Sequence, residues 1–192
     1  MKKIGLFGGT FDPVHNGHVS IARSFMNSGV IDELWILLTP NPPHKKDGKQ
    51  VQYSSRLAML NKAFADLPVT ILTIENDLPK PSYTFQTIRH LKKEHPNYEF
   101  YFCMGEDSLA QFDTWKFFKE ILEEANLLVA KRPGNGHKKV LPEILSQTTF
   151  VSHQPIPIAS SDIRTALAKG EDVKNLVPLE VLKLIVKEHL YQ

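Results

Sequence analysis

The sequence has one cysteine and no long apolar run, and these two shortages exclude several classes of protein. The single thiol, Cys103, leaves no partner for an internal disulfide and fits a reducing compartment. Because Cys103 lies in the apolar run EFYFCM, we expect a buried, inert thiol rather than a nucleophile. No apolar stretch approaches the roughly 20 residues of a membrane span, and none near the start suits a signal peptide. We therefore expect a cytoplasmic protein with no membrane partner.

A strong charge of either sign is also missing. The 23 lysine and arginine residues almost balance the 21 aspartate and glutamate residues, for a net charge of +2. Such a balance gives no general attraction to nucleic acid, so any basic site must be local. The 192 residues, 42% of them hydrophobic, are enough to bury one sizeable core. We expect one domain over residues 1–192 and no nucleic-acid partner.

Two widespread nucleotide-binding signatures, G-x-G-x-x-G and G-x-x-x-x-G-K-[ST], do not occur in the chain. Their absence gives no support to a dinucleotide-dependent oxidoreductase or a P-loop enzyme. The first apolar run, KIGLF, is followed instead by GGTFDPVHNGH, from Gly8 to His18. Any phosphate chemistry must therefore begin from this different motif.

Short apolar runs alternate along the chain with segments of helical period. The runs are almost continuously apolar, as expected of strands that are buried on both faces. The alternation predicts an α/β fold: a Rossmann-like, doubly wound, mainly parallel sheet with helices on both faces. The last two helices form a small C-terminal helical part, at about residues 158–192. Expected strands are Lys3–Phe7, Leu34–Leu38, Val69–Ile74, Phe100–Met104, Leu127–Ala130 and Thr149–Val151, and expected helices are Gly17–Met26, Ser54–Phe64 with capping serines, Thr84–Glu94, Lys116–Glu124, Ser161–Lys169 and Leu179–His189.

Three long loops follow the second, third and fifth expected strands. They are Thr39–Gln52, Asn76–Tyr83 and Arg132–Lys139. In open parallel sheets ligands bind at the carboxyl ends of the strands, where these loops lie. We expect functional residues there.

The segment from Gly8 to His18 is suited to an anion. Consecutive glycines, Gly8 and Gly9, let the backbone turn after the first strand and approach a ligand closely. If a helix begins near Asn16, His15 and His18 lie one turn apart at its N-terminal end, where free N–H groups attract anions. Imidazoles add hydrogen-bond donors. Two other interpretations remain open, a tight turn with two surface histidines and a metal pair, although no third ligand has a suggestive spacing.

The segment GGTFDPVHNGH resembles the signature of the nucleotidyltransferase superfamily, whose H-x-G-H motif is here His15 to His18. A second superfamily signature is a serine- and threonine-rich turn before a late helix, and IASSDIR, Ile158 to Arg164, resembles it. This chain departs from the signature at two positions. Ala159 stands where the family usually has serine or threonine, and Ser161 stands where it usually has threonine. The segments TPNPPHK, PSYTFQTIRHL, MGEDSLAQFDTW, AKRPG and LVPLEVLKLIVKEHLY resemble the bacterial nicotinate-nucleotide adenylyltransferases.

The resemblance, which covers essentially the whole chain, implies an enzyme that joins nicotinate mononucleotide to ATP. The products are deamido-NAD and pyrophosphate, in NAD biosynthesis. The mononucleotide phosphate attacks the α-phosphorus in line, so positioning and charge stabilisation suffice. Mg²⁺ would accompany ATP, held mainly by water and phosphate oxygens, and no all-protein metal site is expected. Two alternatives stay open: a related adenylyltransferase for nicotinamide mononucleotide or another phosphate acceptor, and a non-catalytic nucleotide-binding module. A homodimer is compatible with the sequence.

The resemblance also implies roles for particular residues. His15 and His18 would be catalytic and contact the phosphates. Trp115 would stack on the pyridine ring, and the helix N-terminus near Tyr83 and Thr84 would receive the carboxylate. The ATP-binding residues would be Gly8, Gly9, Thr10, Phe11, His15, His18, Asp107, Ser160, Ser161 and Arg164, and those for the mononucleotide would be Lys45, Tyr83, Thr84, Gly105, Asp107, Trp115 and Arg132.

Several of these residues also have purely structural interpretations. Trp115 would pack beside Phe112 and Phe117, Asp107 would cap the segment SLAQF, Ser160 and Ser161 would cap a helix, and Lys45 and Arg132 would be solvated loop residues. No role is assigned to Asn135–Lys139.

Overall fold

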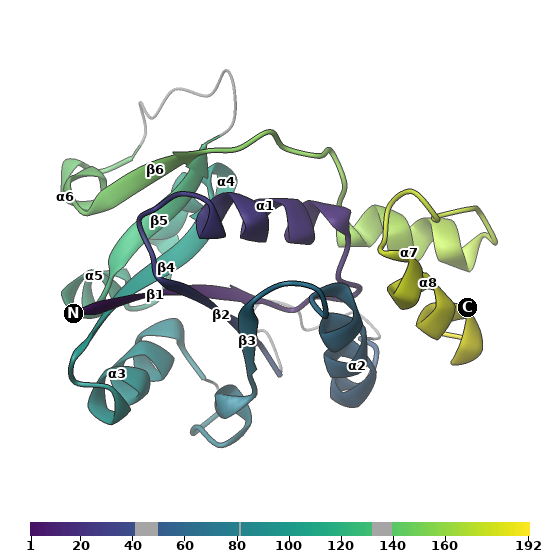
Figure 1. The fold of residues 1–192 in the computed structure, drawn as a ribbon, viewed down its shortest axis with the longest axis horizontal. Helices are drawn as coiled ribbons and strands as arrows, with labels where there is room; N and C mark the ends of the chain where they lie inside the picture. The colour runs from purple at the N-terminus through teal and green to yellow at the C-terminus, as the bar shows by residue number, and fades with distance from the viewer. Residues whose placement is uncertain (41–49, 81, 132–139) are drawn as a thin grey trace.

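The fold is seen in a computed structural model that describes residues 1–40, 50–80, 82–131 and 140–192. Within these residues the strands form one sheet in the order β3-β2-β1-β4-β5-β6, and every neighbouring pair is parallel (Figure 1). The strand order reverses between β1 and β4, which is where open parallel sheets bind ligands. The bounds are β1 Lys2–Gly9, β2 Glu33–Leu38, β3 Val69–Leu72, β4 Tyr98–Gly105, β5 Asn126–Lys131 and β6 Thr148–Ser152.

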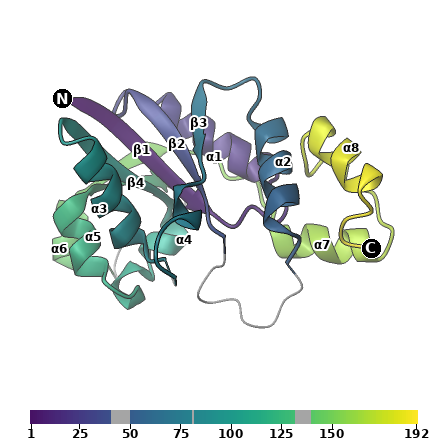
Figure 2. The same cartoon turned by 90° about the horizontal axis from the view of Figure 1, so that it is seen from below.

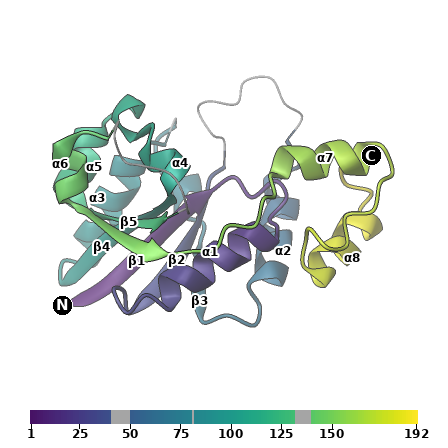
Figure 3. The ribbon, with the colours of Figure 1, turned by 90° about the horizontal axis from the view of Figure 1, so that it is seen from above.

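Helices cover both faces of the sheet, which confirms the predicted Rossmann-like, doubly wound fold. One apolar core includes Phe25 of α1, Leu60 of α2, Ile163 of α7 and Ile185 of α8. The other core takes side chains from α3, α4, α5 and α6. Figures 2 and 3 show α7 and α8 together at one end of the molecule, next to α2. The bounds are α1 Asn16–Met26, α2 Tyr53–Ala63, α3 Thr84–Glu94, α4 Glu106–Leu109, α5 Phe118–Glu124, α6 Pro142–Ser146, α7 Ser160–Ala168 and α8 Leu179–Lys187.

The glycines that were expected to turn after the first strand lie inside it. Gly8 pairs with Leu37 and Gly9 with Leu38 of β2. The chain turns later, where Phe11 takes a left-handed φ of 47°. A Cβ on Gly9 would lie 2.9 Å from the Phe11 ring, so glycine is needed there for close packing rather than for a turn.

Other differences are local. The serines expected to cap α2 lie within it, because the helix begins at Tyr53 and Ser55 donates instead to Glu188 at 3.0 Å. The third strand ends at Leu72, and a 3₁₀ turn takes Ile74–Asn76. The helices α4 and α6 span only four and five residues, too short for a periodic signal.

The single cysteine lies inside the sheet, as expected. Cys103 is 2% exposed, and burial raises the pKa of its thiol well above the usual range. The thiol therefore stays protonated and unreactive at neutral pH. None of the helices in the described parts of the chain is long and apolar enough to cross a membrane.

Candidate active site

The two histidines of the opening motif form a stacked pair at the start of α1. Their ring centroids are 3.7 Å apart and the planes differ by 30°. The backbone N–H of His15, the N-cap residue, donates to Nδ1 of His18 at 3.2 Å. Because Nδ1 accepts this bond, the neutral His18 ring carries its proton on Nε2. One N–H donor is thereby held at the end of a helix whose dipole favours anions.

The glycine between the histidines is required by their stacking. A Cβ on Gly17 would lie 3.0 Å from both Cε1 and Nδ1 of His15. Any larger residue would therefore push the His15 ring aside. On its other side, the His18 ring meets the ring of Phe11 edge to face, with 5.0 Å between centroids. The spacing H-x-G-H thus has a steric reason in this fold.

Burial keeps both rings neutral at neutral pH. Desolvation lowers the pKa of His15 to about 4. The pKa of His18 is also well below 6.5, first because of desolvation and then because of the neighbouring His15. The Nδ1 atom of His15 is buried and has no hydrogen-bond partner in the described part of the chain. An anion at this helix end would offset the desolvation of both rings.

Replacing His15 with glutamine is expected to flatten part of the pH dependence of folding stability. Between pH 6.5 and about 4 the unfolded chain binds a proton at His15 that the folded protein does not. The contribution of neutral His15 to the free energy of unfolding is therefore complete above pH 6.5. It falls as the pH drops, by up to about 3 kcal/mol near pH 4. Urea unfolding at several pH values measures this slope. The remaining slope would belong to the other groups with shifted pKa values, among them His18, Glu75 and Glu124, and an unchanged slope in the variant would contradict a buried neutral His15.

The late motif lies against the opening one. The Ser160 hydroxyl donates to the Pro13 carbonyl at 3.0 Å, and Arg164 Nη1 donates to the Asp12 carbonyl at 2.7 Å. Near the C-terminus, the Tyr191 hydroxyl donates to the buried Asp12 carboxylate at 2.6 Å. These bonds join segments from both ends of the chain. The N-termini of α1 and α7 are therefore brought together, as the two motifs predicted.

The late serines do not cap their helix. The N-cap of α7 is Ala159, and no side chain bonds to the first-turn N–H groups from that position. The hydroxyl of Ser161 is directed to Asp162 instead, at 3.3 Å. The capping interpretation of Ser160 and Ser161 is therefore wrong.

A cavity of about 270 Å³ opens at the carboxyl ends of β1, β2 and β4. It brings together six residues predicted to bind nucleotides, three from the opening motif and three from the regions before α3 and α5. Trp115 lines it while also contacting Phe102 and Phe112, with centroids 5.9 and 5.5 Å away. Packing and ring binding are thus compatible for this indole. The lining residues are Gly8, Gly9, Thr10, Leu37, Thr39, Glu75, Ser82, Tyr83, Thr84, Phe102, Trp115 and Lys116.

The start of α3 forms one wall of this cavity. The N–H of Tyr83 donates to Oε1 of Gln86 at 3.0 Å, and the N–H groups of Gln86 and Thr87 donate to the Tyr83 carbonyl. The backbone N–H of Tyr83 is therefore already used. For a carboxylate at this helix end, the N–H of Thr84 is the candidate nearest to the cavity lining.

Comparison with known proteins identifies the family. The cytidylyltransferase-like family model matches residues 6–166. A Geobacillus kaustophilus protein is 38% identical over 192 residues, covering 100% of this chain and 87% of its own length. A Clostridium tetani protein is 34% identical over 200 residues, covering 100% of both chains. Both carry the name "Probable nicotinate-nucleotide adenylyltransferase". The chain belongs to the cytidylyltransferase-like family and, within it, to the nicotinate-nucleotide adenylyltransferases.

Solved structures share the fold of this adenylyltransferase. The Plasmodium falciparum nicotinic acid mononucleotide adenylyltransferase complexed with NaAD has a TM-score of 0.81 and is 22% identical, covering 100% of this chain and 98% of its own. The same protein complexed with APC gives a TM-score of 0.80 at 22% identity and the same coverage. This likeness confirms the Rossmann-like architecture.

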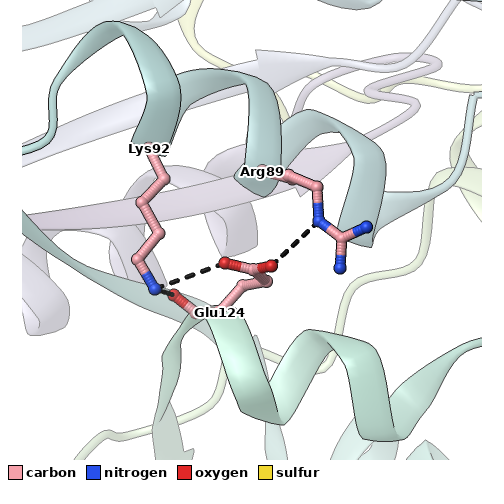
Figure 4. Close-up of polar contacts among 3 residues, drawn as sticks. All are labelled: Arg89, Lys92 and Glu124. Atoms are coloured by element: carbon pink, nitrogen blue, oxygen red, sulfur yellow. Dashed lines mark hydrogen bonds and ion pairs between the residues drawn. The ribbon is translucent and has the colours of Figure 1, made fainter.

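An ion-pair network links α3 to α5, the two helices that follow the Tyr83–Thr84 and Trp115–Lys116 walls of the adenylyltransferase cavity. Figure 4 shows Glu124 of α5 between Arg89 and Lys92 of α3, at 2.9 Å and 3.3 Å. Burial would raise the pKa of the Glu124 carboxyl, but its bonds from these two cations lower it. The network holds α3, which begins at Thr84, against α5, which follows Lys116. Thr84 and Lys116 both line the cavity.

Some predicted residues of this adenylyltransferase lie elsewhere. Gly105 ends β4, and a Cβ there would face Ile21 of α1 at 3.8 Å. Asp107 is exposed in the first turn of α4, whose N-cap is Gly105, so the predicted capping role of Asp107 is wrong. Neither residue lines the cavity. Lys45, Arg132 and the stretch 135–139 lie outside the described residues.

Six residues in the lining were not among the predicted site residues: Leu37, Thr39, Glu75, Ser82, Phe102 and Lys116. Glu75 is buried and accepts a bond from Thr87 at 3.2 Å, and burial raises the pKa of its carboxyl although bonds from Thr87 and Thr39 oppose the shift. Thr39 and Glu75 follow β2 and β3, at the edge of the sheet where ligands were expected. The signal in the sequence that could have indicated these two residues is their position directly after predicted strands.

A larger, more open groove of about 610 Å³ lies between α1 and β6. None of the predicted site residues lines it. Its walls carry serines together with Arg23 and His153, and Ser24 lies 3.0 Å from His153 Nδ1. The smaller cavity is therefore the candidate site, because Gly8, Gly9 and Thr10 of the opening motif line it. Its lining does not include the predicted residues Phe11, His15, His18, Ser160, Ser161 and Arg164.

Proposed function

We propose that this adenylyltransferase transfers the adenylyl group of ATP to nicotinate mononucleotide, with release of pyrophosphate and formation of deamido-NAD for NAD biosynthesis. The observation that carries the proposal is that the segment from Gly8 to His18 contributes to two features: a histidine pair at a helix N-terminus, and a cavity that is also lined by Trp115 and the start of α3. The first suits phosphates, and the second suits a flat aromatic acid. The loop from Gly9 to Phe11 connects them.

The reaction needs no protein nucleophile. A phosphate oxygen of the mononucleotide attacks the α-phosphorus of ATP in line, and the bond to the bridging oxygen of pyrophosphate breaks. Placing both substrates at one edge of the sheet turns this encounter into a nearly unimolecular step. The chain must then stabilise the charge that develops on the phosphate oxygens.

His18 supplies the central donor in this proposal. Its Nε2–H bonds an oxygen on the α-phosphate, since Nδ1 is occupied by the His15 N–H. His15 in its Nδ1–H form adds a second bond from the ring atom that lacks a described partner. Neutral rings act here as fixed donors and need no proton exchange during the transfer.

The β- and γ-phosphates meet the N-terminus of α7. Arg164 uses Nη1 on the Asp12 carbonyl, and an arginine has five N–H donors in all, so the others serve the phosphates. The N–H groups of Ser160 and Ser161 and the hydroxyl of Ser161 complete this end. Asp107 is proposed to contact a ribose hydroxyl or the adenosine, and Gly105 to lie in the mononucleotide site. Lys45 and Arg132 are proposed to bind the mononucleotide phosphate.

Magnesium enters as the complex with ATP. The described residues contain no group of three or more histidine, cysteine, aspartate or glutamate side chains that would hold a metal. The histidine rings and the N–H groups at the start of α1 are hydrogen-bond donors that suit phosphate oxygens, whereas Mg²⁺ prefers oxygen ligands. We therefore assign the ion to phosphate oxygens and water, where it neutralises triphosphate charge. The proposal also includes action as one domain over residues 1–192, in the cytoplasm, with a homodimer as the assembly.

The test is product formation with defined acceptors. The protein is supplied with ATP, Mg²⁺ and either nicotinate mononucleotide or nicotinamide mononucleotide, and pyrophosphate and dinucleotide are followed. We expect deamido-NAD from the acid, at a higher kcat/KM than NAD from the amide. A higher value for the amide would favour the nicotinamide-preferring alternative. ATP binding without product from either acceptor would favour the non-catalytic binding module.

A further inference from the structure

Lys116 stands in the wall of the cavity, directly after Trp115. Its Nζ donates to the Tyr83 hydroxyl at 3.1 Å. The same ammonium lies 4.7 Å from the Tyr83 ring centroid and 5.1 Å from that of Phe117. A hydrogen bond and two cation–π contacts therefore hold an exposed lysine in one place, where most surface lysines are free to rotate.

The two charged side chains that line the described part of the cavity differ in how accessible they are to a ligand. Among the described residues that line it, Lys116 is the one cation and Glu75 the one acid. The Glu75 carboxyl is buried and bonded by Thr87, whereas Lys116 is exposed to the space of the cavity and its solvent. The N-terminus of α3 at Thr84 adds a partial positive charge on the same wall. An entering ligand thus meets a positive rim.

We infer that Lys116 is a specificity-determining residue, whose ammonium pairs with the carboxylate on the pyridine ring and so selects the acid over the amide. This inference rests on the proposed function. Trp115 and Lys116 are adjacent, so the residue that would stack on the ring is followed by the one that meets its substituent. A lysine has three N–H donors, and one is used on Tyr83. The Tyr83 hydroxyl therefore positions the ammonium and leaves two of its N–H donors available for a ligand.

Another use of Lys116 would give a different result. The mononucleotide also carries a phosphate, and an ammonium that bound this phosphate would serve the acid and the amide equally. The two substrates differ only at the ring substituent, which is a charged carboxylate in the acid and a neutral carboxamide in the amide. The ratio of their kcat/KM values therefore separates the two roles.

The experiment compares Lys116→Met with the wild-type protein on nicotinate mononucleotide and on nicotinamide mononucleotide, with ATP and Mg²⁺. We expect kcat/KM for the acid to fall about tenfold and that for the amide to change by less than about twofold. Lys116→Arg keeps the charge and should retain most of the preference. Tyr83→Phe removes the tether and should lower the preference by about threefold.

Lys119→Met is the matched control, because Lys119 lies on α5 near Phe118, 5.9 Å from its ring centroid, and does not line the cavity. It should leave both values unchanged. An equal fall for both substrates in Lys116→Met, or an unchanged preference, would overturn the inference while leaving the proposed function intact. No dinucleotide from the wild-type protein with either substrate would overturn both.

Discussion

Replacing His18 with alanine is expected to lower kcat for dinucleotide formation by about 10²–10³-fold, with the Kd for ATP changed by less than about fivefold. The His18 ring is fixed by the His15 N–H at 3.2 Å and by the edge of Phe11, so its Nε2–H points in one direction. A fixed donor needs no reorganisation when charge develops on the phosphate, and alanine removes it completely. The effect should therefore appear in kcat rather than in ATP affinity.

Two further variants sharpen this test. His18→Gln places an amide N–H₂ near the position of Nε2 and should recover part of the lost kcat. His90→Ala removes a histidine on α3 that pairs with Glu94 at 3.2 Å, and it should leave kcat unchanged. Initial rates with saturating ATP, together with ATP titration by calorimetry, separate chemistry from binding. An equal loss of ATP affinity and turnover in His18→Ala would contradict a role confined to the transition state.

The architecture follows from local sequence because the strands of this sheet are buried on both faces. Four of the six residues of β5, Leu127 to Ala130, are buried, and this is why a continuous apolar run predicts it. The helix α3 was predicted with both of its ends because its apolar positions repeat with helical period over eleven residues. Short helices such as α4 give no comparable signal.

The site was predictable only where a motif carries it. Gly17 and the two histidines are close in sequence, so their geometry is set by one helix start. Lys116 and Glu75 both line the cavity because of the tertiary arrangement of α3, α5 and β3, and no local pattern distinguishes either from a surface charge. Gly9 was predicted to turn the chain because consecutive glycines permit a turn. Its actual role, close contact with the Phe11 ring, depends on the φ of Phe11, which the sequence does not reveal.

Replacing Arg56 with methionine is expected to lower the free energy of unfolding by about 3–5 kcal/mol. Arg56 lies on α2 and is 1% exposed. Burial lowers the pKa of its guanidinium, while the charge of Asp12 raises it. Methionine fills a similar volume but leaves buried carbonyl groups and the Asp12 carboxylate without this cation. The lost bonds go from Nη1 to the carbonyls of Thr10 and Thr39, both at 2.8 Å, from Nη2 to that of Pro40 at 2.7 Å, and from Nε to that of Val51 at 3.2 Å.

The same side chain connects stability to catalysis, because Thr10 and Thr39 both line the cavity. A folded Arg56→Met protein should therefore also have a KM for the mononucleotide that is raised by about tenfold, because the segments at Thr10 and Thr39 are no longer held together. Arg56→Lys keeps the charge but cannot reach all four carbonyls. Its free energy of unfolding and its KM should therefore lie between those of the wild-type protein and Arg56→Met. Arg89→Met, which removes an exposed partner of Glu124, should cost about 1 kcal/mol or less. Urea unfolding measures each variant, and a loss in Arg56→Met no larger than that in Arg89→Met would mean that this buried cation does not hold the two loops.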